Sequence, residues 1–305
     1  MATVTATRKQ TRAATRRSTK AERRSIGRGW MIATYVGLAF FLLWTLVPFL
    51  WMLLASLKTN KEIYDDFTLV PKHLYFGHYA DLLRGSGGSK ASGSFRQWLL
   101  NSTYISVTVT ALSVGLGALA AYSITRLRFT GRPLMARGLI FTYLIPNSLL
   151  FIPLFTIVAR LHLVDSIQAM MLVYPTFTLP FCTWMMASYF RSIPIELEEA
   201  ARVDGCTRLG ALFKVVLPLA APAVAVVAIF AFTQSWNEFL YALVFTNSLA
   251  SRTVTVGLTQ MLGEDVFFWG QMMAGALITA VPPVVLYMVA QRFVIRGLAA
   301  GGVKL

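Results

Sequence analysis

From residue 30 onward the chain consists of long apolar blocks separated by shorter polar connections. The apolar residues in each block are nearly continuous rather than spaced at three and four, which excludes an ordinary globular enzyme and a coiled coil. Each block is about 20 residues or longer, the length that an α-helix needs to cross the hydrocarbon core of a bilayer. The pattern predicts six transmembrane helices, over residues 30–57, 98–124, 139–158, 168–190, 219–245 and 272–290.

The composition is that of a chain whose solvent is lipid. Of 305 residues, 56% are hydrophobic and only 13% are charged, and the mean hydropathy is +0.61. These values also exclude collagen-like, disulfide-framework and wholly disordered chains. The first apolar block follows the polar residues 1–29 and is too long for a signal peptide, so we expect an uncleaved span. The predicted fold class is an all-α membrane protein.

The formal charge of +15 is concentrated at the amino terminus. Residues 1–28 hold nine of the 28 basic residues and one acid, Glu22, with almost no large apolar side chain. Such a composition is typical of a disordered basic tail at a membrane surface. We therefore expect residues 1–29 to be a cytoplasmic tail and expect no nucleic-acid partner.

Lys and Arg residues also predict the orientation in the membrane. An even number of spans places both termini on one side, and cytoplasmic segments carry the excess of positive charge. With the amino terminus inside, the cytoplasmic segments hold nine basic residues in the tail, four in 125–138, four in 191–218 and three after residue 290. The external loops hold only eight, six of them in 58–97. We expect two cytoplasmic termini, a six-helix domain over 30–292 and a cytoplasmic tail over 293–305.

Sequence patterns for nucleotide or metal binding are missing. The run Gly85-Ser-Gly-Gly-Ser-Lys90 resembles a phosphate-binding loop, but Ser89 precedes the lysine and Ala91 follows it, so we interpret it as a flexible linker. Cys182 and Cys206 are expected at different depths and therefore unpaired. The three histidines have no partner at metal-ligand spacing. No metal, cofactor or enzymatic reaction is expected in this chain.

Prolines interrupt most of the predicted spans. In lipid such breaks are tolerated only where neighbours or a cavity satisfy the freed backbone carbonyls. A single proline is explained by a kink that helps helices to pack, but prolines in most spans favour a bundle that moves or encloses a path. The positions are Pro48, Pro146, Pro153, Pro175, Pro180, Pro222, Pro282 and Pro283.

The cytoplasmic connection 191–218 has the pattern of two short helices. Pro194 suits a first helical turn, and the three glutamates that follow complement the positive end of a helix. Gly205 supplies the left-handed conformation that ends this helix. A second helix is expected over 207–216, with one apolar face at three-to-four spacing. That face consists of Leu209, Leu212, Phe213 and Val216.

The same connection carries a family resemblance. Glu199-Ala200-Ala201, then Gly205 after three residues and Val215-Val216-Leu217-Pro218 after nine more, resembles the EAA loop of membrane subunits of bacterial ATP-binding-cassette importers. The family pattern usually has Ile at the position of Val215. The resemblance implies that 191–218 is a cytoplasmic coupling helix between the fourth and fifth spans, seated on a separate ATPase. Glu199 would anchor it, Ala200 and Ala201 would allow close approach, Gly205 would make the turn, and Leu217 and Pro218 would close the motif.

Other stretches resemble the sugar-importer branch, and in particular its maltose-permease-like second membrane subunit. They are the long first external loop, Trp236-Asn237-Glu238-Phe239-Leu240, Thr255-Val256-Gly257-Leu258 and the closing stretch 296–304. The resemblance implies that the carboxyl tail, with Gly297, Gly301 and Lys304, reaches between the ATPase subunits. The basic tail 1–29 has no counterpart in the family pattern.

The resemblance further implies a complete import machine in the cytoplasmic membrane of a prokaryote. This chain would pair with a second, homologous permease subunit and dock on two ATPase subunits, which bind the ATP and Mg. An extracytoplasmic solute-binding protein would deliver a sugar. ATP binding would close the ATPase dimer and pull the coupling helix inward.

A substrate path is less clearly marked in the sequence. Glu238 is the only acid within a predicted span, where an ionisable group is a candidate functional residue. A structural hydrogen-bonding role beside Asn237 or Trp236 is at least as well supported. Sugars need aromatic faces together with hydrogen-bonding groups. Further candidates for lining the path are Tyr143, Asn147, Tyr174, Thr176, Thr178, Gln234 and Asn237.

Two alternatives remain open. The same machine could carry a polyol, a glycerol-phosphate ester or another small polar solute. A stand-alone carrier driven by an ion gradient would want several intramembrane charges and an internal inverted repeat. The chain has one such acid and no evident repeat, so this second alternative is disfavoured.

Overall fold

The computed structural model describes residues 28–65, 68–86, 92–262 and 268–301, and every regular element in these ranges is a helix. The chain divides into two parts, residues 1–51 and 52–305. In the first part the described residues belong to α2 (Arg28–Ser56), a continuous apolar helix with Pro48 inside it. The predicted tail 1–29 lies almost wholly outside the described residues.

The second part begins with the end of α2, and its described residues form sixteen further helical elements. They are α3 (Asn60–Asp65), α4 (Gly77–Arg84), the short 3-10 helix η1 (Ser92–Ser94), α5 (Phe95–Arg126), α6 (Arg132–Leu144), α7 (Asn147–Arg160), α8 (Ile167–Val173), α9 (Pro175–Ser192), α10 (Ile195–Val203), α11 (Arg208–Ala211), the π-helical turn η2 (Leu212–Val216), α12 (Leu217–Leu219), α13 (Ala221–Trp236), α14 (Leu240–Phe245), α15 (Val254–Gln260) and α16 (Trp269–Gly301).

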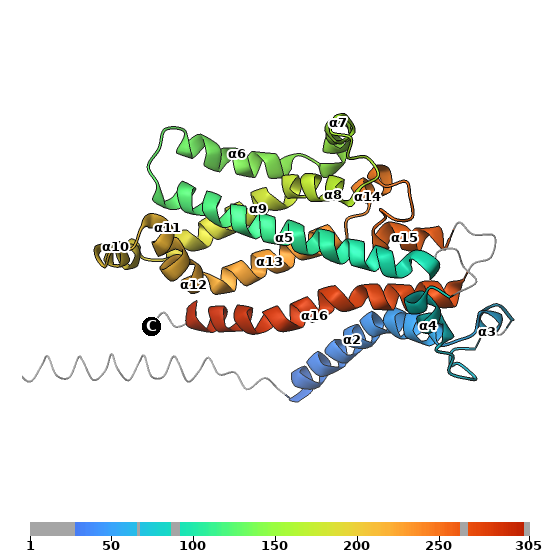
Figure 1. Cartoon of the computed structure of the whole chain (residues 1–305). Coiled ribbons are helices and arrows are strands. Elements are labelled where there is room, and N and C mark those ends of the chain that lie inside the picture. The colour runs from blue at the N-terminus through green and yellow to red at the C-terminus, as the bar shows by residue number, and fades with distance from the viewer. Residues whose placement is uncertain (1–27, 66–67, 87–91, 263–267, 302–305) are drawn as a thin grey trace, which may run out of the picture. The chain divides into compact units, whose positions relative to one another are not determined.

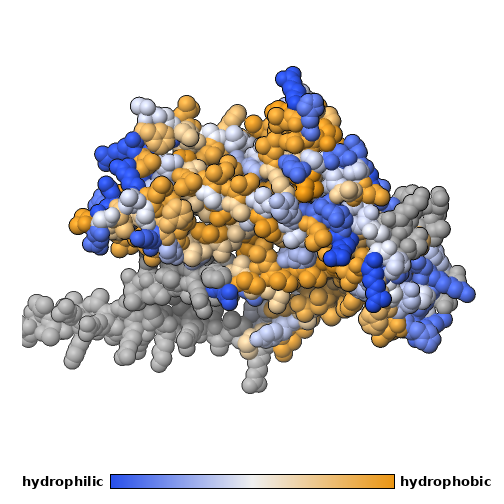
Figure 2. Space-filling view, in the orientation of Figure 1, coloured by the Kyte–Doolittle hydropathy of each residue, from blue (hydrophilic) through white to orange (hydrophobic). Residues whose placement is uncertain are grey.

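Long helices form the centre of this second part. Figure 1 shows α5, α9, α13 and α16 running beside one another; α5 packs on α9 and α13, and α13 packs on α16. Small residues allow the close approach of α5 and α9, since a Cβ on Gly117 would come 3.2 Å from Cys182 Cβ. In Figure 2 hydrophobic residues cover the middle of the visible face, and hydrophilic residues gather over α10 and α11 at one end and α3 and α4 at the other.

Within the described residues, four helical stretches are long and apolar enough to cross a membrane: 29–56, 95–126, 167–192 and 269–292. A fifth is added if the stretch Arg208–Leu219 and α13, which meet at an angle of 84°, count as one broken span. An all-helical fold of membrane type is therefore confirmed.

Two of the six expected spans are not continuous helices, and a third, expected over 168–190, has a one-residue break at Tyr174 between α8 and α9. The helix expected over 139–158 is broken at Ile145-Pro146, because a proline forces the residue before it into an extended conformation, here with ψ 122°. The helix expected over 219–245 stops at Trp236, and α14 begins only at Leu240. At the carboxyl end α16 continues to Gly301, so no change of secondary structure marks the boundary expected at residue 292.

Candidate functional site

The first helix of the connection 191–218 has the bounds that its capping residues predict. Pro194 precedes α10, and Gly205 has a φ of +92°, the left-handed conformation that ends a helix. The backbone N–H of Cys206 then closes the turn on the carbonyl of Ala201, at 3.0 Å. The stop at Gly205 is confirmed, and the helix begins at Ile195, one residue later than expected.

The second helix differs from the expected one. Thr207 caps it by accepting a hydrogen bond from Gly210 N at 3.0 Å, but after Ala211 the helix widens into the π turn η2. Leu212 and Val216 are buried, whereas Leu209 and Phe213 are 57% and 60% exposed. The four apolar residues expected on one face are thus divided between two environments. The reason is that only Leu212 and Val216 face this chain's own core, while Leu209 and Phe213 form a second row beside it.

The motif residues of α10 lie on the surface. Glu199 and Ala200 are exposed and Ala201 is half-buried; at the end of the motif Leu217 is half-buried and Pro218 is exposed. Glu198 is different, since it is buried and accepts a hydrogen bond from Tyr122 Oη. Sequence reasoning did not single out Glu198, because nothing local distinguishes it from its two neighbouring glutamates.

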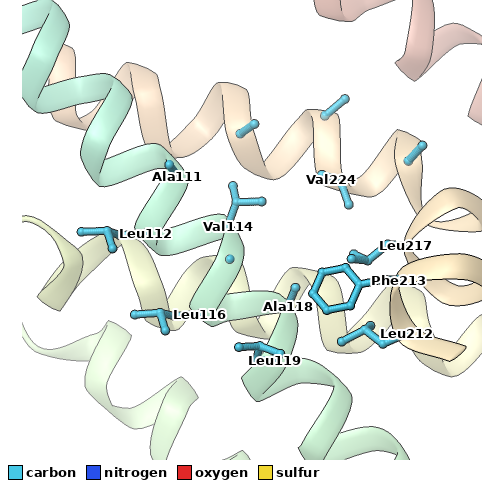
Figure 3. Close-up of a pocket in the computed structure, with 14 residues that line it drawn as sticks. Ala111, Leu112, Val114, Leu116, Ala118, Leu119, Leu212, Phe213, Leu217 and Val224 are labelled. Atoms are coloured by element: carbon cyan, nitrogen blue, oxygen red, sulfur yellow. The ribbon is translucent and has the colours of Figure 1, made fainter. Parts of the chain in front are cut away.

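An apolar groove begins beside η2. It has a volume of about 600 Å³ and lies between α5 and the helices from η2 to α13 (Figure 3). Its wall on α5 includes Leu112, Leu116 and Leu119, and the ring of Phe213 closes one end. The lining is apolar throughout, so the groove suits lipid chains or an apolar helix rather than a polar solute.

A second, smaller cavity is polar. It has a volume of about 260 Å³ and lies where α6, α7, α9 and α13 meet. Three of the residues expected along a substrate path line it together: Asn147, Thr176 and Gln234. The remaining lining residues are Thr142, Ile145, Pro146, Leu150, Phe177, Pro180 and Phe230. Amide and hydroxyl groups beside aromatic rings, with no charged group in the lining, suit a neutral hydroxylated solute.

Other predicted path residues lie next to this cavity rather than in it. Glu238 precedes α14 and accepts hydrogen bonds from the backbone N–H groups of Tyr241 at 2.9 Å and Ala242 at 3.1 Å. Tyr174 is fully buried and donates to Glu238 Oε2 at 2.7 Å. The carboxylate of Glu238, one residue before the N-cap residue Phe239, thus satisfies backbone donors in the first turn of α14, which accords with the structural role. Asn237 is exposed, and the side chain of Tyr143 is outside the described residues.

The predicted external loops are held by polar contacts. Asp165 Oδ1 accepts hydrogen bonds from Asn247 N at 2.8 Å, Ser248 N at 2.9 Å and the hydroxyl of Ser251. The Ser251 hydroxyl and these backbone donors hold the pKa of the Asp165 carboxyl well below its usual range. This carboxylate joins the turn before α8 to the loop after α14.

The stretch Thr255-Val256-Gly257-Leu258 has a packing explanation. Any Cβ on Gly257 would lie 2.1 Å from the indole of Trp98, so only glycine allows this approach of α15 to α5. Trp98 in turn donates from Nε1 to the carbonyl of Leu249 at 2.7 Å. This glycine therefore holds the predicted last external loop against α5.

The other residues singled out in the sequence are those of the carboxyl tail and the two cysteines. Gly297 and Gly301 lie in the last turns of α16, and Lys304 is outside the described residues. Cys182 and Cys206 are both free thiols, as expected. No group of three or more His, Cys, Asp or Glu side chains that could hold a metal ion occurs in the described ranges.

Comparison with known proteins assigns the chain to a family. Residues 113–299 match the family described as "Binding-protein-dependent transport system inner membrane component". The chain is 38% identical to the inner membrane ABC transporter permease protein YcjP of Escherichia coli, over 90% of this chain and 96% of that protein. It is 35% identical to the trehalose transport system permease protein SugB of Mycobacterium tuberculosis, over 86% of this chain and 93% of that protein.

A solved structure has the same fold. A chain of a bacterial ABC transporter involved in the import of the acidic polysaccharide alginate aligns with a TM-score of 0.73 and 24% identity. The alignment covers 88% of this chain and 97% of the other.

Proposed function

Because the chain belongs to the family of binding-protein-dependent transport system inner membrane components, we propose that it is the membrane-spanning permease subunit of an ATP-binding-cassette importer for a sugar or oligosaccharide. It is a transport component and not an enzyme, and the ATPase activity lies in a separate subunit. The observation that carries this function is the exposed helix α10 with the motif Glu199-Ala200-Ala201 and its Gly205 turn.

This motif supports docking on an ATPase for a physical reason. A nine-residue helix with an exposed glutamate and small alanines can enter a groove closely, and the left-handed Gly205 sends the chain back toward the membrane helices. We infer that Glu199 anchors α10 to the ATPase and that Ala200 and Ala201 pack against it. Leu217 and Pro218 then lead into the sharp bend before α13.

The polar cavity supports the solute class. Its amide, hydroxyl and phenyl groups match what a sugar needs, and the trehalose permease is among the relatives. On this proposal Asn147, Thr176 and Gln234 line the path, and Tyr174 and Glu238 hold the broken helix ends around it. Tyr143 and Asn237 stay assigned to the same path.

The partners follow from the family. A solute-binding protein delivers the sugar, a second homologous permease completes the channel, and two ATPase subunits bind ATP and Mg. The apolar groove and the apolar α2 offer surfaces for the second permease and for lipid. The topology we propose has six spans, two of which are the broken segments 139–158 and 219–245, with both termini in the cytoplasm. Gly297, Gly301 and Lys304 would then lie on the ATPase side.

Uptake measurements test the function. Cells with and without the gene are supplied with radiolabelled trehalose, maltose, xylose, sorbitol and glycerol 3-phosphate. We expect uptake of one of the sugars to be lost when the gene is deleted. The wild-type gene should restore this uptake, and the Glu199→Arg gene should not. Loss of sorbitol or glycerol 3-phosphate uptake alone would favour the polyol or ester cargo. Uptake abolished by collapsing the proton gradient at constant ATP would favour the stand-alone carrier.

A further inference from the structure

Glu198 and Glu199 are adjacent on α10 but differ in their surroundings. Glu198 is 6% exposed, whereas Glu199 is exposed. Successive side chains on an α-helix point about 100° apart, so one can face the protein while the other faces outward. A buried carboxylate in a nine-residue surface helix needs charged or hydrogen-bonding partners, because desolvation without them is costly.

The partners of Glu198 both come from the last turns of α5. Arg126 Nε lies 3.3 Å from Glu198 Oε2, and the hydroxyl of Tyr122 donates to Glu198 Oε1. Tyr122 and Arg126 are four residues apart and therefore share one face of α5. The carboxylate of α10 is thus held by two groups on one rigid helix.

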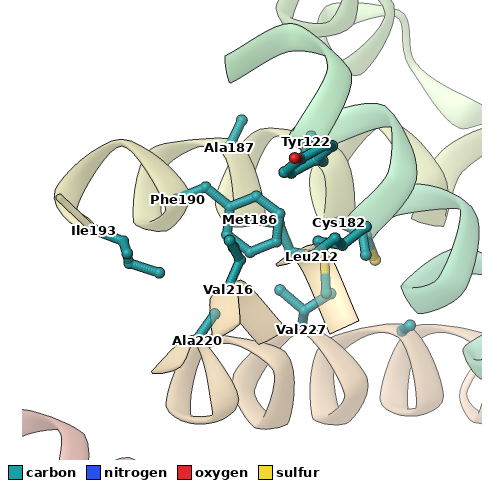
Figure 4. Close-up of a cluster of buried hydrophobic side chains, with 13 residues drawn as sticks. Tyr122, Cys182, Met186, Ala187, Phe190, Ile193, Leu212, Val216, Ala220 and Val227 are labelled. Carbon is teal, nitrogen blue, oxygen red and sulfur yellow. The ribbon is translucent and has the colours of Figure 1, made fainter. Parts of the chain in front are cut away.

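The same two side chains also hold the neighbouring segments. Arg126 Nη2 donates to the carbonyls of Phe190 at 2.9 Å and Ile193 at 2.7 Å, at the end of α9. Tyr122 Oη lies 3.1 Å from the carbonyl of Arg208, at the start of α11. Figure 4 shows Tyr122 above the apolar cluster of Met186, Phe190 and Leu212, which fills the space between these helices.

A hydrogen bond also joins α5 and α9 close to the polar cavity. Ser113 Oγ on α5 lies 2.6 Å from Thr178 Oγ1 on α9, and both side chains are buried. Thr178 is two residues from Thr176, which lines the cavity. A displacement of α10 that moves α5 therefore also moves the start of α9, since the interior of this bundle is close-packed.

We propose that Glu198, held by Tyr122 and Arg126, is the link through which displacement of α10 reaches the solute cavity, while Glu199 serves docking on the ATPase. Glu198, Tyr122 and Arg126 are positioning residues that touch neither ATP nor solute. This inference rests on the proposed function, because it assigns the inner and outer faces of one coupling helix.

The test uses the full importer with its ATPase, second permease and binding protein in lipid nanodiscs. Thr176→Cys is introduced into a Cys182→Ala, Cys206→Ser background, and its labelling rate with a maleimide is measured with and without ATP and Mg. We expect Glu198→Gln to reduce the ATP-dependent change in labelling rate about tenfold while the ATPase still co-purifies. Tyr122→Phe, which removes only one hydroxyl, should reduce it by a smaller factor.

Matched controls lie on the same two helices. Glu196→Gln removes an exposed carboxylate of α10, and Tyr104→Phe removes an exposed hydroxyl of α5. Both should keep the full ATP-dependent change. Because Tyr122 and Glu198 belong to one link, combining Tyr122→Phe with Glu198→Gln should reduce the ATP-dependent change in labelling rate no further than Glu198→Gln alone.

The outcomes separate this inference from the proposed function. The parent complex carries Thr176→Cys but neither test substitution. If it assembles and its labelling rate changes with ATP, but Glu198→Gln and Tyr122→Phe show the same change as the parent, the proposed link is wrong. If these variants lower only the amount of folded complex, and the folded part responds fully, their role is merely structural and the inference also fails. If the parent itself binds no ATPase, the proposed function fails before any variant is compared.

Discussion

The hydroxyl of Tyr174 donates a hydrogen bond of 2.7 Å to Glu238 Oε2 and so joins two interrupted helices. Tyr174 stands between α8 and α9, and Glu238 stands between α13 and α14. Tyr241, whose backbone N–H binds the same carboxylate, donates from its own hydroxyl to the carbonyl of Asn147 at 2.7 Å. The breaks of three expected spans therefore meet at one polar cluster beside the solute cavity.

Glu238→Gln should lower stability. The amide has only one acceptor oxygen, so one of the three donors now served by the carboxylate loses its partner, at a cost of about 1–3 kcal/mol. Thermal unfolding of the purified protein in detergent measures this, with Glu196→Gln as the control for loss of charge. An unchanged melting temperature together with lost uptake would instead make Glu238 a solute contact.

Substitutions at Gly205 should separate backbone strain from side-chain volume. A Cβ at this position meets nothing within 4 Å, so only the φ of +92° opposes a side chain. Gly205→Asn should keep most uptake, because Asn tolerates the left-handed region. Gly205→Val should lose uptake while the protein still accumulates in the membrane, since left-handed backbone costs other residues roughly 1–2 kcal/mol. Equal uptake by both variants would refute the turn as the reason for this glycine.

The contact of Asp165 with residues 247–251 should weaken in acid. Because hydrogen bonds lower the pKa of this carboxyl in the folded protein, its stabilising effect is complete above the ordinary pKa of about 4 and is lost as the pH falls below it. Hydrogen exchange of the Asn247 and Ser248 amides, corrected for the intrinsic rate, should therefore accelerate below about pH 4.

Asp165→Asn supplies the control for this titration. Asn tolerates the φ of +62° found at residue 165 but cannot ionise. Its side-chain oxygen can still accept hydrogen bonds from both amides, so their exchange should show no acceleration in acid. The Thr246 amide, which donates to Ala242 O, should not change. Acid acceleration that persists in Asp165→Asn would show that another group titrates.

Gln234→Leu should weaken sugar uptake through the cavity. Loss of one hydrogen bond to a hydroxylated solute is worth about 1 kcal/mol, so KM should rise about fivefold while membrane accumulation is unchanged. Gln168→Leu makes the same substitution at an exposed position of α8 outside the cavity and should leave KM unaltered. If KM changed in Gln168→Leu but not in Gln234→Leu, the cavity would not be part of the solute path.

Local signals made α10 predictable, whereas contacts between distant residues did not. Pro194 and Gly205 act on their own backbone, and α10 lies between them over Ile195–Val203, within a residue or so of the expected helix. Pro146 breaks a helix, but Pro180 lies inside α9, and only the surrounding packing distinguishes the two. The difference between Glu198 and Glu199 depends on Tyr122 and Arg126, more than 70 residues earlier in the chain.

The sequence also did not predict the break between α13 and α14. It has no proline, and it is stabilised by Glu238, whose carboxylate satisfies backbone donors in the first turn of α14. The composition of residues 219–245 showed that they were apolar enough for a span but did not indicate that the helix stops at Trp236. The grouping of Asn147, Thr176 and Gln234 around one cavity likewise depends on how three separate segments pack.

The central claim is that α10 docks on an ATP-binding-cassette ATPase, and cross-linking in native cells tests it most directly. A photo-cross-linking amino acid replaces Val203, which is 88% exposed on α10, and for comparison Val70, which is 68% exposed in the predicted first external loop. After irradiation the tagged chain is purified and its adducts are identified by mass spectrometry. The account predicts an ATPase adduct from position 203 and none from position 70. An ATPase adduct from neither position, with the chain extracted alone, would contradict it.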